Sequence, residues 1–225
     1  LVTERASKAE ATQRSGRAGR VAPGKCYRMW ARAEEGMMAT FAPPEINTSD
    51  LAPLALQLTK WGTKPKDLAF LTSPPKNSWA QAQDLLDKLG AITDGKLSPH
   101  GAQLAELPLH PRFAQMLIKA GPTAAPLAAL LSDRDILISR EADLTPALQA
   151  LSNKSPNHQT RDPETLKRIK IEANRLVKLS PETTFLINYS PAQCLALAYP
   201  ERVAQRRPGT QPHYIMANGK GVILA

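Results

Sequence analysis

Apolar residues recur at helical spacing in the first half of the chain. Between positions 51 and 61 they fall three and four residues apart, at Leu51, Leu54, Leu58 and Trp61. Gly62 follows directly, and glycine commonly ends a helix because it adopts a left-handed backbone without strain. The spacing predicts a helix over 51–61 with those four side chains on its buried face.

A second helix and a hairpin follow. Residues 78–89 carry a stripe of Trp79, Ala82, Leu86 and Leu89, and residues 92–97 are centred on Asp94-Gly95, a dipeptide typical of tight hairpin turns. Helix, linker, helix and hairpin over 43–97 predict a winged helix. The exposed face of its second helix is neutral to acidic, with Gln81, Gln83, Asp84, Asp87 and Lys88. We therefore expect this domain to pack against the protein rather than to read DNA.

Helical patterns continue to residue 179. Ser98-Pro99 predicts a capped start, residues 113–117 resume the helical period, and residues 126–131 and 145–151 stay apolar. Residues 153–162 are polar and predict a loop. The longest helix is predicted over 163–179, with Leu166, Ile169, Ala173 and Leu176 inward and Lys167, Arg168, Lys170, Arg175 and Lys178 on its other faces. A solvated face is the simpler interpretation of these cations, and a wall of a nucleic-acid channel is the alternative.

The pattern changes near the end of the chain. Ser190-Pro191 predicts a helix start, and residues 203–207, 213–216 and 221–224 then predict short strands, with turns at Pro208-Gly209 and Asn218-Gly219. Short strands are also expected at 1–3 and 26–29. The predicted fold class is thus multidomain and mainly α, with α/β and β parts.

Composition indicates a globular protein with a polyanionic partner. The chain has 225 residues, 42% of them hydrophobic, and a net charge of +9. Residues 1–30 carry seven cations against two acids and residues 196–225 carry four against one, so the two ends hold most of the charge. No apolar run reaches the roughly 18 residues that span a bilayer, so no membrane partner is expected. The start of the chain, LVTE, reads neither as a signal peptide nor as a natural start, which favours a piece of a longer chain.

Cysteine and histidine give no sign of a metal site. Cys26 and Cys194 have no partner at ligand spacing, which argues against zinc and disulfides and favours a reducing cytoplasm. The four histidines also lack partners at ligand spacing, so turn or surface positions are expected for His100, His110, His158 and His213.

The strongest chemical signal is residues 13–20, which read QRSGRAGR. If they open a helix, Gln13, Arg17 and Arg20 project from one face, where guanidinium groups suit phosphate oxygens. Gly16 and Gly19 would let a neighbouring backbone approach closely. The alternative is a solvated basic turn with no role in ligand binding.

Residues 7–30 resemble motif VI of superfamily 2 helicases of the DEAH/RHA group, where Q-x-x-G-R-x-G-R precedes P-G-x-C-Y-R-L. Ser15 and Met29 depart from the commoner alanine and leucine. Residues 97–112 resemble that group's L-T-P-x-G to L-P-L-x-P-R junction. Residues 198–221 are similar to the start of the OB-like domain in its bacterial HrpB subfamily.

The resemblance implies four domains and a set of site residues. It assigns 1–42 to the end of a second RecA-like domain, 43–97 to a winged helix, 98–197 to a helical ratchet bundle and 198–225 to the start of an OB-like domain. Gln13, Arg17 and Arg20 would be catalytic, contacting the γ-phosphate of ATP together with Gly16. Arg206, Arg207, Tyr214 and Lys220 are the candidates for nucleic-acid contacts, although a core position for Tyr214 is an equal alternative.

The implied activity is ATP-dependent 3′ to 5′ translocation along a single strand, with RNA favoured over DNA and the remaining helicase domains as partners. The chain itself has no D-E-x-H box, and residues 19–25 match Walker A spacing but are followed by Cys26 instead of Ser or Thr. ATP and Mg²⁺ would therefore be held mainly by other residues. A nucleic-acid-binding module with a degenerate motor and a protein-interaction scaffold are the alternatives.

Overall fold

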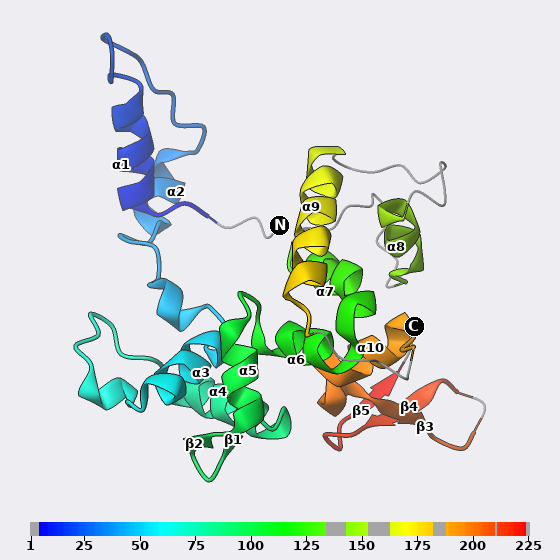
Figure 1. Cartoon of the computed structure of the whole chain (residues 1–225). Coiled ribbons are helices and arrows are strands. Elements are labelled where there is room, and N and C mark those ends of the chain that lie inside the picture. Colours follow the sequence, from blue (N-terminus) through cyan, green and yellow to red (C-terminus); the bar gives the residue numbers. More distant parts are fainter. Residues whose placement is uncertain (1–4, 134–142, 153–162, 182–187, 210, 224–225) are drawn as a thin grey trace.

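The computed structural model describes residues 5–133, 143–152, 163–181, 188–209 and 211–223. Figure 1 shows a helical arm at the start of the chain, a helical unit with a small hairpin, a helical bundle and a small sheet near the end. The predicted strand at 1–3, the predicted loop at 153–162 and His158 lie outside the described residues. The chain is mainly helical with small sheets, as the hydrophobic pattern predicts.

The arm consists of α1 (Lys8–Arg17) and α2 (Arg32–Met37). Backbone hydrogen bonds from Lys8 N to Ala39 O (2.9 Å) and from Ala9 N to Thr40 O (3.0 Å) hold the two ends of the arm together. The strand predicted over 26–29 is wrong, because this segment forms no ladder with any described residue. A strand needs a hydrogen-bonded neighbour, and the arm supplies none at that position.

The second unit contains the elements predicted from hydrophobic spacing. It runs through η1 (Glu45–Asn47), α3 (Ala52–Trp61), η2 (Pro65–Asp67), α4 (Lys76–Lys88), β1 (Ile92–Thr93), β2 (Lys96–Leu97) and α5 (Pro99–Glu106). Gly62 ends α3 with a φ of 73°, and Asp94 and Gly95 form the hairpin turn with φ values of 52° and 72°. In the antiparallel hairpin, Ile92 pairs with Leu97 and Thr93 with Lys96.

One position on α3 differs from the prediction. Trp61 is 78% exposed, whereas Leu51 and Leu58 are buried and Leu54 is half-buried. Ala52, Ala55 and Leu56 are also buried, so the face that meets the core is rotated toward the small residues. Trp61 is the last residue of the helix, where it falls beyond the edge of this core.

Gly101 shows how tightly α5 packs on the hairpin unit. A Cβ at Gly101 would lie 1.9 Å from the carbonyl oxygen of Ala91 and 2.9 Å from the Cδ1 of Leu97. Only glycine fits this close approach. Ser98 begins the helix by accepting a hydrogen bond from Gly101 N at 2.9 Å, which confirms the predicted cap.

The bundle is built from α6 (Pro111–Ala120), η3 (Gly121–Ala124), α7 (Ala125–Leu131), α8 (Thr145–Leu151), α9 (Pro163–Leu179) and α10 (Pro191–Ala198). Ile169, Ala173 and Leu176 of α9 are buried as predicted, with Leu166 half-buried at the edge. Leu107 and Leu109 pack against both this core and that of the hairpin unit, so the two units share a continuous apolar junction.

The chain then passes through η4 (Pro200–Arg202) into an antiparallel sheet of β3 (Ala204–Arg206), β4 (His213–Met216) and β5 (Gly221–Ile223), in the order β3-β4-β5. All three strands match the predicted positions within two residues, although residue 224 lies outside the described residues. Within the described part of the chain, no helix combines the length and apolar composition needed to cross a bilayer.

Candidate nucleotide and nucleic-acid contacts

Helix α1 presents most of the arginine motif to solvent. Ser7 caps it through a reciprocal box, in which Glu10 N donates to Ser7 Oγ (3.2 Å) and Ser7 N donates to Glu10 Oε2 (2.8 Å). The S-x-x-E sequence at 7–10 is a typical capping-box pattern and indicates the start of α1. The hydrogen bonds that Ser7 N and Ser7 Oγ donate to the Glu10 carboxylate lower the pKa of Glu10 below its ordinary value. Ala11 is the one buried residue of α1, and Gln13 and Arg17 are exposed.

Arg20 does not lie on the helix, so the prediction of one helical face for all three residues is wrong. Helix α1 ends at Arg17, with Ala18 as its C-cap, and Arg20 lies in the bend that follows. Two glycines near this end offer little helical stability, which explains the early stop. The three side chains are exposed, and neither Arg17 nor Arg20 forms an ion pair with any described residue.

The glycine that permits close packing is not one of those predicted. Around Gly16 and Gly19 no heavy atom comes within 4 Å of a built Cβ among the described residues. At Gly24, by contrast, a Cβ would lie 1.9 Å from the carbonyl oxygen of Ala18. Gly24 therefore lets the segment after α1 fold back against the end of the helix. Gly16 and Gly19 remain open to an approaching group.

The arm also exposes large apolar side chains. Tyr27 is 78%, Met29 89%, Met37 71% and Phe41 71% exposed. Four such residues on a short segment are more than scattered surface hydrophobics, and a surface of this kind marks an interaction site.

The final sheet separates the predicted nucleic-acid contacts. Arg206 pairs with Tyr214, and Tyr214 pairs with Val222, so these three side chains share one face. Arg207 follows Arg206 and points to the opposite face, and Lys220 precedes β5 in the turn. Tyr214 is half-buried, so its exposure lies between that of an exposed stacking residue and that of a core residue, the two alternatives predicted for it. Arg206 and Tyr214 are thus brought together, and Arg207 is not.

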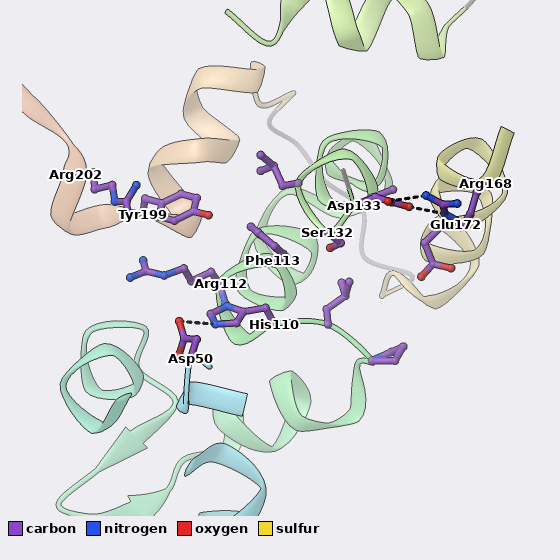
Figure 2. Close-up of a pocket in the computed structure, with 14 residues that line it drawn as sticks. Asp50, His110, Arg112, Phe113, Ser132, Asp133, Arg168, Glu172, Tyr199 and Arg202 are labelled. Carbon is purple, nitrogen blue, oxygen red and sulfur yellow. Dashed lines mark hydrogen bonds and ion pairs between the residues drawn. The ribbon is translucent and has the colours of Figure 1, made fainter. Parts of the chain in front are cut away.

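A cleft of about 740 Å³ lies where the hairpin unit, the bundle and the segment leading into the sheet meet. Figure 2 shows Tyr199 in this cleft near both Arg112 and Arg202. The guanidinium carbons lie 4.7 Å and 4.8 Å from the centre of the tyrosine ring. Two cations on one ring give a cation–π stack that joins α6 to η4.

Arg112 is the centre of this arrangement. Its Nη1 donates to the carbonyl oxygen of Ala198 at 2.9 Å, and its Nη2 lies 2.9 Å from Glu201 Oε1. The Arg112 and Glu201 side chains are only 15% and 16% exposed. Burial by itself would raise the pKa of Glu201, but the hydrogen bond from Arg112 and the positive charges of Arg112 and Arg202 outweigh it and lower that pKa.

Asp50 and His110 form the lower edge of the cleft in Figure 2. His110 Nε2 lies 3.2 Å from Asp50 Oδ2, and Ala52 N donates to Asp50 Oδ1 at 2.8 Å. The hydrogen bond from His110, opposed by burial and helped by that from Ala52, lowers the pKa of Asp50 from 3.8 to about 2. The carboxylate therefore links the start of α3 to the start of α6.

We expect the stabilising effect of Asp50 to depend on pH. Because the pKa of Asp50 falls on folding, its contribution is present above pH 3.8 and is lost as the pH drops toward about 2. Asn at position 50 can still cap α3 but cannot ionise. Urea unfolding should show wild type more stable than D50N near pH 6, by under about 1 kcal/mol for this half-exposed group. That difference should shrink between pH 4 and pH 2; a constant difference would contradict the assignment.

The comparisons with known proteins cover the whole chain. It is 34% identical to the ATP-dependent RNA helicase HrpB of Escherichia coli (strain K12) over 230 aligned residues, which cover 100% of this chain and 26% of that protein. It is 40% identical to the probable ATP-dependent RNA helicase DHX35 of Homo sapiens over 124 residues, which cover 54% of this chain and 18% of that protein. No family model matches the chain.

Comparison with solved structures also finds HrpB. A crystal structure of the E. coli DExH-box NTPase HrpB matches 100% of the chain with a TM-score of 0.69 at 34% identity. A crystal structure of the Escherichia coli DEAH/RHA helicase HrpB matches 99% with a TM-score of 0.73 at 32% identity. The chain belongs to the DEAH/RHA group of helicases. It spans about a quarter of the HrpB relatives that it matches.

Membership in the DEAH/RHA group confirms the resemblance drawn from residues 7–30, 97–112 and 198–221. Residues of the junction motif make contacts that stabilise the fold. His110 accepts a hydrogen bond from Arg112 N (3.3 Å) at the start of α6, and Arg112 forms an ion pair with Glu201. Arg112 belongs to the junction motif in the sequence, but the motif predicted no contact for its side chain. Its partner lies 89 positions away, and no local spacing pairs them.

The histidines and the α9 cations singled out in the sequence have varied surroundings. His100 contacts Gln115, and His213 lies exposed in β4. Among the described residues no group of three or more His, Cys, Asp or Glu side chains is placed to hold a metal ion. On α9, Arg168 pairs with Asp133 (2.7 Å) and Arg175 with Glu172 (3.0 Å), whereas Lys167 and Lys178 are exposed. Arg168 and Arg175 are thus engaged in ion pairs within the chain.

Proposed function

We propose that this chain is the C-terminal part of an ATP-dependent helicase that couples ATP hydrolysis to 3′ to 5′ movement along a single strand, with RNA as the favoured substrate. The observation that carries the proposal is the 34% identity over the full chain to a protein named as an ATP-dependent RNA helicase, with the arginine motif exposed on the arm. We also propose the domain roles that the family resemblance implies for residues 1–42, 43–97, 98–197 and 198–225.

In this proposal the arm faces a nucleotide held by a partner lobe. Gln13, Arg17 and Arg20 are exposed, and the two arginines have no ion pair with a described residue, so their donors are available to phosphate oxygens. The open surroundings of Gly16 leave room for that nucleotide, and the apolar side chains of Tyr27, Met29, Met37 and Phe41 supply a surface for the partner lobe.

ATP would supply the phosphoryl group, and its γ-phosphate fits the donor set of the arm. Arg17 and Arg20 would stabilise charge on the transferring group, and loss of that group would let the arm and its partner lobe separate. Mg²⁺ would be bound mainly by residues outside this chain, since residues 19–25 lack the Ser or Thr that follows a Walker A loop.

The nucleic-acid strand would be held partly by the final sheet. Arg206 and Tyr214 share one face, which pairs a cation for the phosphate with an aromatic ring for a base. Lys220 lies in the adjoining turn and extends the positive charge, whereas Arg207 would contribute only on the opposite face.

The test uses the full-length protein. We expect oligouridine to stimulate ATP hydrolysis, and a duplex with a 3′ single-stranded overhang to be unwound while one with a 5′ overhang is not. Strand binding with no hydrolysis would indicate the degenerate nucleic-acid-binding module. Absence of both at low salt would indicate a protein-interaction scaffold and overturn the proposal.

A further inference from the structure

A second pocket lies on the hairpin unit, apart from the central cleft. It has a volume of about 640 Å³ and is formed by the end of α3, the segment around η2, one face of α4 and the hairpin turn. Four lysines line it, namely Lys64, Lys66, Lys76 and Lys96, and no acidic residue does. All these elements lie together in the cyan and green part of Figure 1.

These lysines are not used to stabilise the fold. None of the four has an ion pair with a described residue, whereas Lys60 and Lys88 of the same unit pair with Glu106 (2.7 Å) and Asp84 (2.6 Å). Lys76 is the first residue of α4, where a positive charge is unfavourable for the helix dipole. The pocket thus concentrates uncompensated charge at some cost to local stability.

The acids nearest in sequence do not neutralise this charge. Asp67 accepts a hydrogen bond from the backbone N–H of Lys64 at 3.2 Å, so it is used to cap η2. Asp94 lies in the hairpin turn beside Gly95, with a φ of 52°. Neither lines the pocket.

One tryptophan lines the pocket, and a second precedes a lining residue in the sequence. Trp79 of α4 lines the pocket and is half-buried. Trp61 ends α3, directly before the pocket residue Gly62, and is 78% exposed although its size and apolarity favour burial. Aromatic rings beside cations are the combination by which proteins hold single strands, with bases stacked on rings and phosphates on cations.

We propose that this pocket binds single-stranded nucleic acid independently of sequence, as a contact additional to the arm and the final sheet. Lys64, Lys66, Lys76 and Lys96 bind the phosphates, and Trp61 stacks on a base. An acidic peptide would satisfy the lysines but gives no reason for the exposed tryptophan. This role differs from that of a DNA-reading winged helix, because it uses the first residue of α4 and the hairpin turn.

The test compares charge-matched variants of the full-length protein by fluorescence anisotropy with fluorescein-labelled oligouridine. K64A/K66A removes two pocket lysines, and the control K60A/K88A removes two paired lysines of the same unit. We expect the pocket variant to lower affinity about fivefold or more and to reduce the slope of log K against log salt by about 1.4, since each phosphate contact contributes about 0.7. The control should change either quantity far less. W61A should lower affinity about fivefold or more.

Three results would overturn the proposal. Equal effects of K64A/K66A and K60A/K88A would mean that general charge is responsible. An unchanged affinity in both K64A/K66A and W61A would exclude the contact. If polyglutamate displaces oligouridine from the protein, and W61A binds oligouridine with the same affinity as wild type, the occupant of the pocket is an acidic protein segment.

The outcome is separable from that of the proposed function. K64A/K66A should lose affinity to the same extent in an R206A background, because the sheet contact is elsewhere. If the wild-type protein hydrolyses no ATP, the proposed function fails, while the anisotropy comparison still decides whether the pocket binds the strand.

Discussion

Replacing Arg17 or Arg20 with alanine should lower strand-stimulated ATP hydrolysis in the full-length protein by about a thousand-fold or more. An arginine that stabilises the transferring phosphoryl group contributes roughly this factor to the rate. ATP binding should weaken much less, because the charge that the arginine meets develops mainly in the transition state. Steady-state hydrolysis at saturating oligouridine, together with nucleotide affinity measured by equilibrium binding, checks both parts.

Arg14 provides the matched control. It lies on the same exposed helix at a variable position of the Q-x-x-G-R-x-G-R pattern, so R14A removes an equal charge without touching the predicted phosphate contacts. Its hydrolysis rate should stay within a few-fold of wild type. Near-normal turnover in both R17A and R20A, or an equal loss in R14A, would remove the assignment of these arginines to the nucleotide.

The second large effect is expected at Arg112. R112A removes the hydrogen bond to Ala198 O, the ion pair with Glu201 and the cation–π contact with Tyr199, and it leaves the Glu201 carboxylate largely buried without its strongest partner. Breaking a buried pair on one side typically costs about 3–5 kcal/mol. The expected loss of unfolding free energy is about 3 kcal/mol. Urea unfolding measures it, and hydrogen exchange should show the loss centred on α10 and β3.

Arg202 is the control for this site. It also lies over the Tyr199 ring, but its side chain is 68% exposed and its Nε lies 3.8 Å from Glu201 Oε1. R202A should cost under about 1 kcal/mol. In R112A/E201Q, part of the loss should be recovered, because no buried charge is then left unpaired. An equal cost for R112A and R202A would show that Arg112 is not the link between the bundle and the sheet.

Local patterns were enough to predict most elements of this protein. Hydrophobic spacing placed α4 and α9, proline and serine placed the starts of α5 and α10, and Asp94-Gly95 placed the hairpin. These features depend on interactions within a few residues, such as caps, turn conformations and the alignment of one helix face. The motif at residues 13–20 likewise pointed to the helicase family, since its chemistry is carried by neighbouring residues.

Features that depend on distant contacts could not be predicted in this way. Trp61 has the right spacing for a buried stripe, but the core that α3 meets is filled by Ala52, Ala55 and Leu56. The strand expected at 26–29 has no neighbour to pair with among the described residues. Arg206 and Arg207 are adjacent in sequence, but the pleat of the sheet places them on opposite faces.

The amino-acid sequence alone was sufficient for the helices, the turns and the family, because short-range periodicity and motif chemistry are contained in a few consecutive residues. Only the folded chain could bring Arg112 to Glu201, Asp50 to His110, and four lysines to Trp79 in one pocket of the hairpin unit. Those groups meet because buried cores bring remote segments together, and burial strengthens the electrostatic interactions between them.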